Sequence, residues 1–143
     1  MRDTIWVLNK ENITITGISD RIKSYINKLR PSYEHINIEV AENIENNVRV
    51  GSQKALNIFR IVQEAVHNAF RHSNAKNILV QIESGQNISM VIKDDGSGIT
   101  NEPGSDSNGL RNMKARAADA GIKFSVQSFA GAGTSILLET TTN

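Results

Sequence analysis

Four short polar patterns in this sequence could do chemistry, and the first lies on a predicted helix from Ser52 to His72. Glu64 and Asn68 are four residues apart there, and Arg71 and His72 follow one turn later, so a helix places all four on one polar face. Carboxylate and amide oxygens beside basic groups suit a metal-bound polyphosphate. A solvated helix face explains the same residues, and this helix taken alone favours that simpler interpretation.

The other three patterns are rich in glycine. In DDGSG, residues 94–98, a carboxylate at a strand end can accept a hydrogen bond from an exocyclic amine such as that of adenine, and glycines let a flat ligand approach the backbone. Asn108 and Gly109 open another predicted helix, where backbone N–H groups attract phosphate. GAGT, residues 131–134, is either a tight hairpin or a turn that presents a hydroxyl. Each pattern alone also has an ordinary structural explanation, as an Asp/Gly turn, a helix N-cap or a hairpin.

Hydrophobic periodicity predicts the elements that must position these residues. An amphipathic helix covers 18–29, with Ser19 or Asp20 near its start, and ends before Pro31. A strand follows at 36–40, then a polar loop at 42–51, and strands at 77–83 and 87–93 come after the Ser52 helix. A helix at 109–120 and strands at 124–128 and 134–139 complete the chain. This order predicts an α+β two-layer sandwich in which three helices cover one face of a mixed sheet of about five strands.

Composition narrows the functional classes. The chain has 143 residues, enough for one domain with its own core, and its net charge of +1 gives no support to a nucleic-acid partner. It has no cysteine, which excludes disulfides and thiolate-bound zinc. A zinc site at His67 and His72 is disfavoured, because residues five apart on a helix diverge by about 140° and no third ligand is evident. No apolar run is long enough to span a membrane, so we expect no direct membrane contact.

The four patterns, in this order and spacing, resemble the GHKL ATP-binding superfamily of gyrase, heat-shock chaperones, histidine kinases and mismatch-repair ATPases. The segments EAVHNAFRHSNA (64–75) and GLRNMKARA (109–117) are similar to the catalytic and ATP-binding domain of sensor histidine kinases. The branch with the strongest resemblance is the one paired with response regulators that carry NarL-type output domains. The resemblance covers about residues 18–140 and implies the Bergerat ATP-binding fold.

For the phosphate end of the site, the resemblance implies roles for the residues on the long helix. Asn68 matches the ligand of a Mg²⁺ ion that bridges the triphosphate, and Arg71 and His72 match basic positions beside the phosphates. Glu64 occupies the place where related ATPases keep a general base. In a kinase, a general-base role and a Mg²⁺-positioning role for Glu64 both remain open.

For the adenine end, Asp94 matches the carboxylate that accepts from the adenine amine. Gly96 and Gly98 let the base lie flat, and Ile99 lines its pocket. Thr134 matches a hydroxyl that supports the Asp94 end of the pocket, often through water.

A mobile lid, residues 100–108, is implied between these two ends, with Gly109 and Leu110 as its hinge. Three positions depart from the usual pattern. Ser107 replaces a glycine, which should stiffen the hinge, and Asn112 and Ala115 replace a glycine and a glutamate on the following helix.

The resemblance thus implies a Mg-ATP-dependent domain that transfers the γ-phosphoryl group to a histidine on the dimerisation domain of its parent protein, for relay to a NarL-type response regulator. Residues 1–12 resemble the tail of that preceding domain, and 13–143 form the ATP-binding domain. We expect it to be cytoplasmic, whether or not the parent is anchored in a membrane. Two alternatives are a serine kinase of the anti-sigma-factor type and a non-catalytic nucleotide-sensing interaction module.

Overall fold

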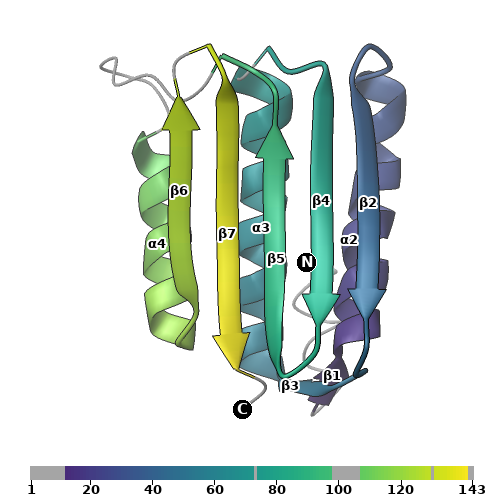
Figure 1. The fold of residues 1–143 in the computed structure, drawn as a ribbon, viewed down its shortest axis with the longest axis vertical. Helices are drawn as coiled ribbons and strands as arrows, with labels where there is room; N and C mark the ends of the chain where they lie inside the picture. Colours follow the sequence, from purple (N-terminus) through teal and green to yellow (C-terminus); the bar gives the residue numbers. More distant parts are fainter. Residues whose placement is uncertain (1–11, 73, 98–106, 130, 142–143) are drawn as a thin grey trace.

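The computed structural model describes residues 12–72, 74–97, 107–129 and 131–141. Its elements form two layers, with helices α2, α3 and α4 on one face of a five-stranded sheet (Figure 1). In chain order they are β1 (Asn12–Thr14), α2 (Ile15–Leu29), the 3₁₀ helix η1 (Arg30–Ser32), β2 (Asn37–Ile44), β3 (Arg49–Gly51), α3 (Ser52–His72), β4 (Asn77–Ser84), β5 (Asn87–Asp94), α4 (Ser107–Ala120), β6 (Lys123–Phe129) and β7 (Gly133–Thr141).

The main sheet has the strand order β2-β4-β5-β7-β6. Strands β2 and β4 are parallel and are joined by a crossover that contains α3, whereas every other neighbouring pair is antiparallel. The predicted mixed sheet of about five strands under three helices is therefore confirmed.

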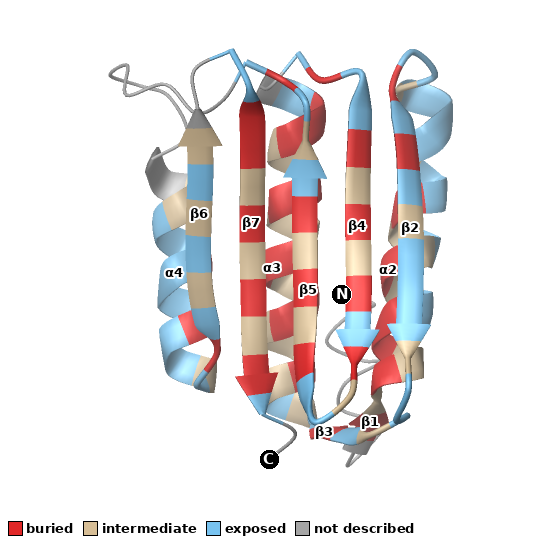
Figure 2. Cartoon of the chain, in the orientation of Figure 1, coloured by how far each residue is buried: buried red, intermediate tan, exposed pale blue. Residues whose placement is uncertain are grey.

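The hydrophobic core lies between the helices and the sheet, as the alternating bands of buried residues along β4, β5 and β7 show (Figure 2). Helical spacing in the sequence predicts one buried stripe along α3, which consists of Ala55, Leu56, Phe59, Val62, Val66, Ala69 and Phe70. The observed stripe is wider than this. Leu56 is only partly buried, while Ile58, Ile61 and Ala65 are buried in addition to the expected residues. Helix α3 is central in its layer, between α2 and α4, so it contacts neighbours on more of its surface than a helix that packs on a sheet alone.

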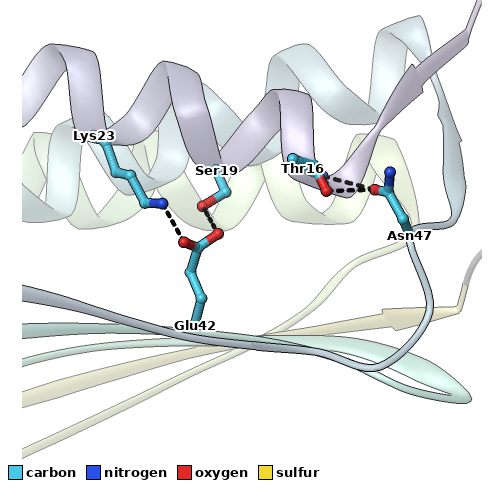
Figure 3. Close-up of polar contacts among 5 residues, drawn as sticks. All are labelled: Thr16, Ser19, Lys23, Glu42 and Asn47. Atoms are coloured by element: carbon cyan, nitrogen blue, oxygen red, sulfur yellow. Dashed lines mark hydrogen bonds and ion pairs between the residues drawn. The ribbon is translucent and has the colours of Figure 1, made fainter.

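Helix α2 begins three residues earlier than predicted, and neither Ser19 nor Asp20 caps it. The hydroxyl of Thr14 is the N-cap and accepts a hydrogen bond of 3.1 Å from the Gly17 N–H. Ser19 instead lies buried in the middle of the helix and donates to Glu42 of β2 over 2.6 Å, and Lys23 forms an ion pair with the same carboxylate (Figure 3). These contacts fasten α2 to the edge strand of the sheet.

The segment 42–51, expected to be a polar loop, is partly strand. Strand β2 continues to Ile44, and β3 pairs with β1 in a separate two-stranded sheet, where Ile13 lies opposite Val50. Both of these side chains are buried. Asn47 lies between β2 and β3, and its side-chain oxygen accepts hydrogen bonds from the N–H and the hydroxyl of Thr16 at the start of α2 (Figure 3).

The chain direction brings four element ends to one edge of the sandwich, the upper edge in Figure 1. Helix α3 and strand β5 end there, and helix α4 and strand β7 begin there. All four patterns identified in the sequence belong to these ends.

Candidate functional site

Helix α3 carries the first group of candidate residues near its C-terminal end. Glu64 and Asn68 are partly buried, and Arg71, nearly one turn further on, is exposed. His72 is the last residue of the helix, and its side chain lies outside the described part of the structure. The apolar stripe of α3 faces the sheet, and this orientation turns Glu64 and Asn68 away from the sheet.

The start of α4 packs directly on these two side chains. A Cβ atom added to Gly109 would lie 3.1 Å from Nδ2 of Asn68 and 3.7 Å from the carboxyl carbon of Glu64. Leu110 and Met113 anchor this helix in the core. Glycine at position 109 therefore lets the α4 backbone approach the polar face of α3. The predicted hinge residues Gly109 and Leu110 are described, whereas residues 100–106 of the predicted lid lie outside the described residues.

The two carboxylates at the end of β5 have different surroundings. Asp95 accepts hydrogen bonds from the N–H groups of Lys76 and Asn77, at 2.8 and 2.9 Å, and from the Asn77 side chain at 2.8 Å. These bonds hold the pKa of Asp95 below its usual value. They also fasten the end of β5 to the start of β4, so Asp95 has a structural role.

Asp94 is half-buried and accepts from the Gly96 N–H at 2.9 Å. Burial raises the pKa of Asp94, although hydrogen bonds from the backbone of Gly96 and Thr134 partly offset this effect. Gly96 is itself buried. Gly98 and Ile99, also predicted for the adenine end, lie outside the described residues.

Thr134 is buried opposite Asp94 in the β5–β7 ladder. Its hydroxyl lies 3.2 Å from the hydroxyl of Ser128 on β6, and its backbone supports Asp94. The preceding residue, Gly133, was not among the predicted site residues. It has a φ of +93°, and a Cβ atom there would lie 2.1 Å from the carbonyl oxygen of Asp94. The alternating glycines of GAGT were the available signal, because they allow such close approach of two backbones.

A cleft of about 330 Å³ opens on the outer side of α3, between α2 and α4. Glu64 lies in its wall, together with Tyr25, Arg60, His67, Asn112 and Arg116. His67 Nδ1 lies 3.7 Å from Glu64 Oε2. Burial, together with the negative charge of Glu64, raises the pKa of Tyr25 to about 12, so this hydroxyl stays protonated. Apart from Glu64, none of these residues was predicted as part of the site, because they come together only when the three helices pack.

The donor set fits Mg²⁺ bound with a polyphosphate better than a metal held by protein alone. Within the described ranges, no group of three or more histidine, cysteine, aspartate or glutamate side chains could hold a metal ion. Mg²⁺ needs no such cage, because it keeps several waters and takes one or two protein oxygens besides those of the phosphates. Asn68 and Glu64, side by side beneath the start of α4, supply oxygens of this kind.

Proteins similar to this chain include ATPases and sensor histidine kinases. A family model described as histidine kinase-, DNA gyrase B- and HSP90-like ATPase matches residues 53–142. The sensor protein VraS of Staphylococcus haemolyticus is 38% identical over 81 residues, which cover 55% of this chain and 23% of that protein. An uncharacterized sensor-like histidine kinase of Chloroflexus aurantiacus is 27% identical over 146 residues, covering 96% of this chain and 24% of the relative. The chain thus spans about a quarter of the length of these curated relatives.

Solved structures share the fold. The mycobacterial sensor histidine kinase MprB superimposes with a TM-score of 0.68 at 21% identity, over 92% of this chain and 96% of that structure. The histidine kinase domain of a blue-light activated kinase from Erythrobacter litoralis gives a TM-score of 0.70 at 20% identity, over 93% of this chain and 64% of that one. None of the helices in the described ranges combines the length and apolar character required to cross a membrane.

Proposed function

Because this chain belongs to the family of histidine kinase-, DNA gyrase B- and HSP90-like ATPases, we propose that it binds Mg-ATP and donates the γ-phosphoryl group to a histidine on a separate helical domain. It is an ATP-binding catalytic domain of the kind found in two-component sensor histidine kinases. The metal ion, the phosphoryl acceptor and the response regulator are parts of the proposal.

The observation that carries the proposal is the meeting of α3 and α4. Glu64 and Asn68 lie beneath the first turn of α4, with Gly109 close enough that a Cβ atom would contact both. Asp94 ends β5 at the same edge of the sandwich (Figure 1). Oxygen donors, the N-terminus of a helix and a half-buried carboxylate at one edge form a set that suits a triphosphate and an adenine.

Each residue of the proposed site has a role in binding Mg-ATP. Asn68 would hold the metal ion, which when bound would neutralise charge on the phosphates, and Glu64 would orient this ligand or accept a proton. Arg71 and His72 offset the remaining phosphate charge from the end of α3. Asp94 accepts from the adenine amine, and Gly96, Gly98, Ile99 and Thr134 shape the pocket around the base. Catalysis then consists mainly of positioning and charge neutralisation.

The proposal extends to the rest of the protein. Residues 1–12 are assigned as the tail of a preceding dimerisation region that carries the phosphoacceptor histidine, and residues 13–143 as the catalytic domain. A response regulator with a NarL-type output domain would receive the phosphoryl group. The catalytic domain would act in the cytoplasm.

Titration calorimetry with ATP, in the presence and absence of Mg²⁺, tests the metal assignment. We expect Asn68→Ala to abolish the Mg²⁺ dependence of ATP binding without unfolding the domain, since Asn68 is only partly buried. Asn57→Ala is the matched control. Asn57 lies on the same helix about three turns away and bonds to the backbone oxygen of Gln53, so its loss should leave ATP binding unchanged.

Three other results would contradict the proposed function or the role of Asn68. Failure of the unaltered chain to bind ATP would reject it. Circular dichroism showing an unfolded Asn68→Ala variant would assign Asn68 to the structure instead of the metal. Label transferred from γ-labelled ATP to serine of an added partner would favour the serine-kinase alternative.

A further inference from the structure

The cleft lined by α2, α3 and α4 lies next to the proposed Mg-triphosphate position and has a basic wall. Glu64 belongs both to the cleft and to the contact with Gly109. The cleft therefore begins where the triphosphate would end and continues along both helices, past Asn112, to Arg116 on α4 and Arg60 on α3.

A phosphoryl group at this end needs cations besides the metal ion. Glu64 is negative, and a phosphate within a few ångströms of a carboxylate is repelled by it. Arg71 is exposed near the C-terminal end of α3 and does not line the cleft. The cleft supplies cations on the other side, from Arg60 and Arg116.

The two arginines differ in direction and in their existing bonds. Side chains on a helix lean toward its N-terminus. Arg116 follows Gly109 by seven residues, about 10 Å along the axis of α4, so for Arg116 this direction leads toward Gly109 and the two side chains beneath it. For Arg60 on α3 the same rule leads away from Glu64, and its Nη1 already donates to Oε1 of Gln63 at 3.2 Å. Arg116 forms no hydrogen bond or ion pair with any residue in the described part of the chain and is exposed at the cleft.

We propose that Arg116 contacts the terminal phosphoryl group of bound ATP and so makes the site prefer ATP to ADP. This inference rests on the proposed function, because it needs the triphosphate to lie over Asn68. A guanidinium group offers paired N–H donors that match two phosphate oxygens, which a lysine cannot reproduce. Contact with the terminal group alone means that ADP, which lacks it, gains nothing from Arg116.

The test compares ATP and ADP dissociation constants, measured by titration calorimetry with Mg²⁺ on the whole chain. We expect Arg116→Ala to weaken ATP binding about tenfold and to leave ADP binding within about twofold, as loss of a charge-assisted hydrogen bond in an open cleft predicts. The ATP dissociation constant of Arg116→Lys should lie between that of the unaltered chain and that of Arg116→Ala. Lys114→Ala is the matched control, because it removes the same charge from an exposed position of α4 outside the cleft wall and should leave both constants unchanged.

Three results would overturn the inference while leaving the proposed function intact. Equal loss of ATP and ADP affinity in Arg116→Ala would assign a general electrostatic or structural role, and so would the same loss in Lys114→Ala. Unchanged ATP and ADP affinities in Arg116→Ala would mean that Arg116 does not contact the terminal phosphoryl group. Failure of the unaltered chain to bind ATP would instead reject the proposed function and this inference together.

Discussion

At the residue scale, the neighbouring carboxylates Asp94 and Asp95 differ in their hydrogen-bond partners and in the direction of their pKa shifts. The oxygens of Asp95 accept from the backbone and side chain at the start of β4. Within the described ranges, Asp94 accepts from the backbone N–H groups of Gly96, beside it, and Thr134, opposite it. Burial raises the free-energy cost of the charge on Asp94, as at many functional sites, and this agrees with the proposed contact between Asp94 and a ligand.

This difference predicts opposite effects of Asp94→Asn on stability and on binding. The raised pKa means that the folded state binds a proton more tightly than the unfolded chain, so the charged carboxylate lowers stability above its pKa. Removal of the charge should therefore move the urea midpoint at pH 7 upward. ATP affinity should fall roughly ten- to a hundredfold, because a charged acceptor for the adenine amine is lost.

The pH dependence gives the control for Asp94. In the unaltered chain, ATP affinity should fall as the pH is lowered through the raised pKa of Asp94, because the protonated carboxyl no longer accepts as a carboxylate. Asp94→Asn should keep only the part of this dependence that belongs to the nucleotide. Identical pH profiles for the two proteins would remove Asp94 from the adenine end.

Gly133 gives a second prediction at this scale. A side chain there would require an unfavourable φ and would place Cβ 2.1 Å from the Asp94 carbonyl oxygen, so the backbone must shift. Gly133→Ala should lower the free energy of unfolding by about 2–4 kcal/mol. Gly131→Ala, in the same turn with a φ of +78° and nothing within 4 Å of an added Cβ, should cost only about 1–2 kcal/mol. Urea unfolding compares the two, and equal losses would contradict the proposed backbone contact.

At the scale of elements, α2 is fastened to the edge strand β2 through Glu42, which accepts from Ser19 and pairs with Lys23 (Figure 3). These partners hold the pKa of Glu42 below its ordinary value. A lowered pKa stabilises the fold above the ordinary pKa, and this contribution is lost as the pH falls through the folded value.

We therefore expect Glu42→Gln to lower the free energy of unfolding near neutral pH, by at most about 1 kcal/mol because the pair is partly exposed. The difference from the unaltered chain should shrink in acid, below the ordinary value of 4.5. Glu39→Gln removes the same charge from an exposed position of the same strand and is the control. Urea titrations across the acid range measure both, and equal behaviour of the two variants would contradict a specific role for Glu42.

The sequence predicted elements wherever the signal was local. The helix face with Glu64 and Asn68 and the alternation in β4 and β5 follow from residues a few positions apart. The pair β1–β3 was missed, because strands of three residues are too short to show alternation and Ile13 meets Val50 only in the folded chain. The cleft was missed for the same reason, since Tyr25 and Arg116 belong to different helices. Gly133 could be noticed as a glycine, but its contact with Asp94 could not.

At the scale of the whole molecule, the three histidines predict what the chain cannot do alone. His35 is exposed shortly before β2, and His67 and His72 belong to α3 itself. A histidine on the helix that is proposed to bind the nucleotide would lie beside the phosphates and could not approach the γ-phosphate in line, as phosphoryl transfer requires. We expect the isolated chain to bind Mg-ATP but to accumulate no phosphohistidine.

Phosphohistidine is measured by incubating the protein with γ-labelled ATP and testing it for acid-labile, base-stable phosphate. Transfer should appear when the two-helix histidine domain of its parent protein is added. Stoichiometric label on the chain alone would show that one of its own histidines is the acceptor.

The direction of the strands places the start of β1 and the end of β7 at the edge opposite the proposed site. Strand β1 begins at Asn12 and β7 ends at Thr141, both at the lower edge in Figure 1, whereas α3 and β5 end at the upper one. Nine residues of β7 separate the two edges by about 30 Å. A domain joined to the chain at the lower edge would lie about 30 Å from the proposed nucleotide site. A rotation of about 30° about that junction would therefore move the proposed site by about 15 Å.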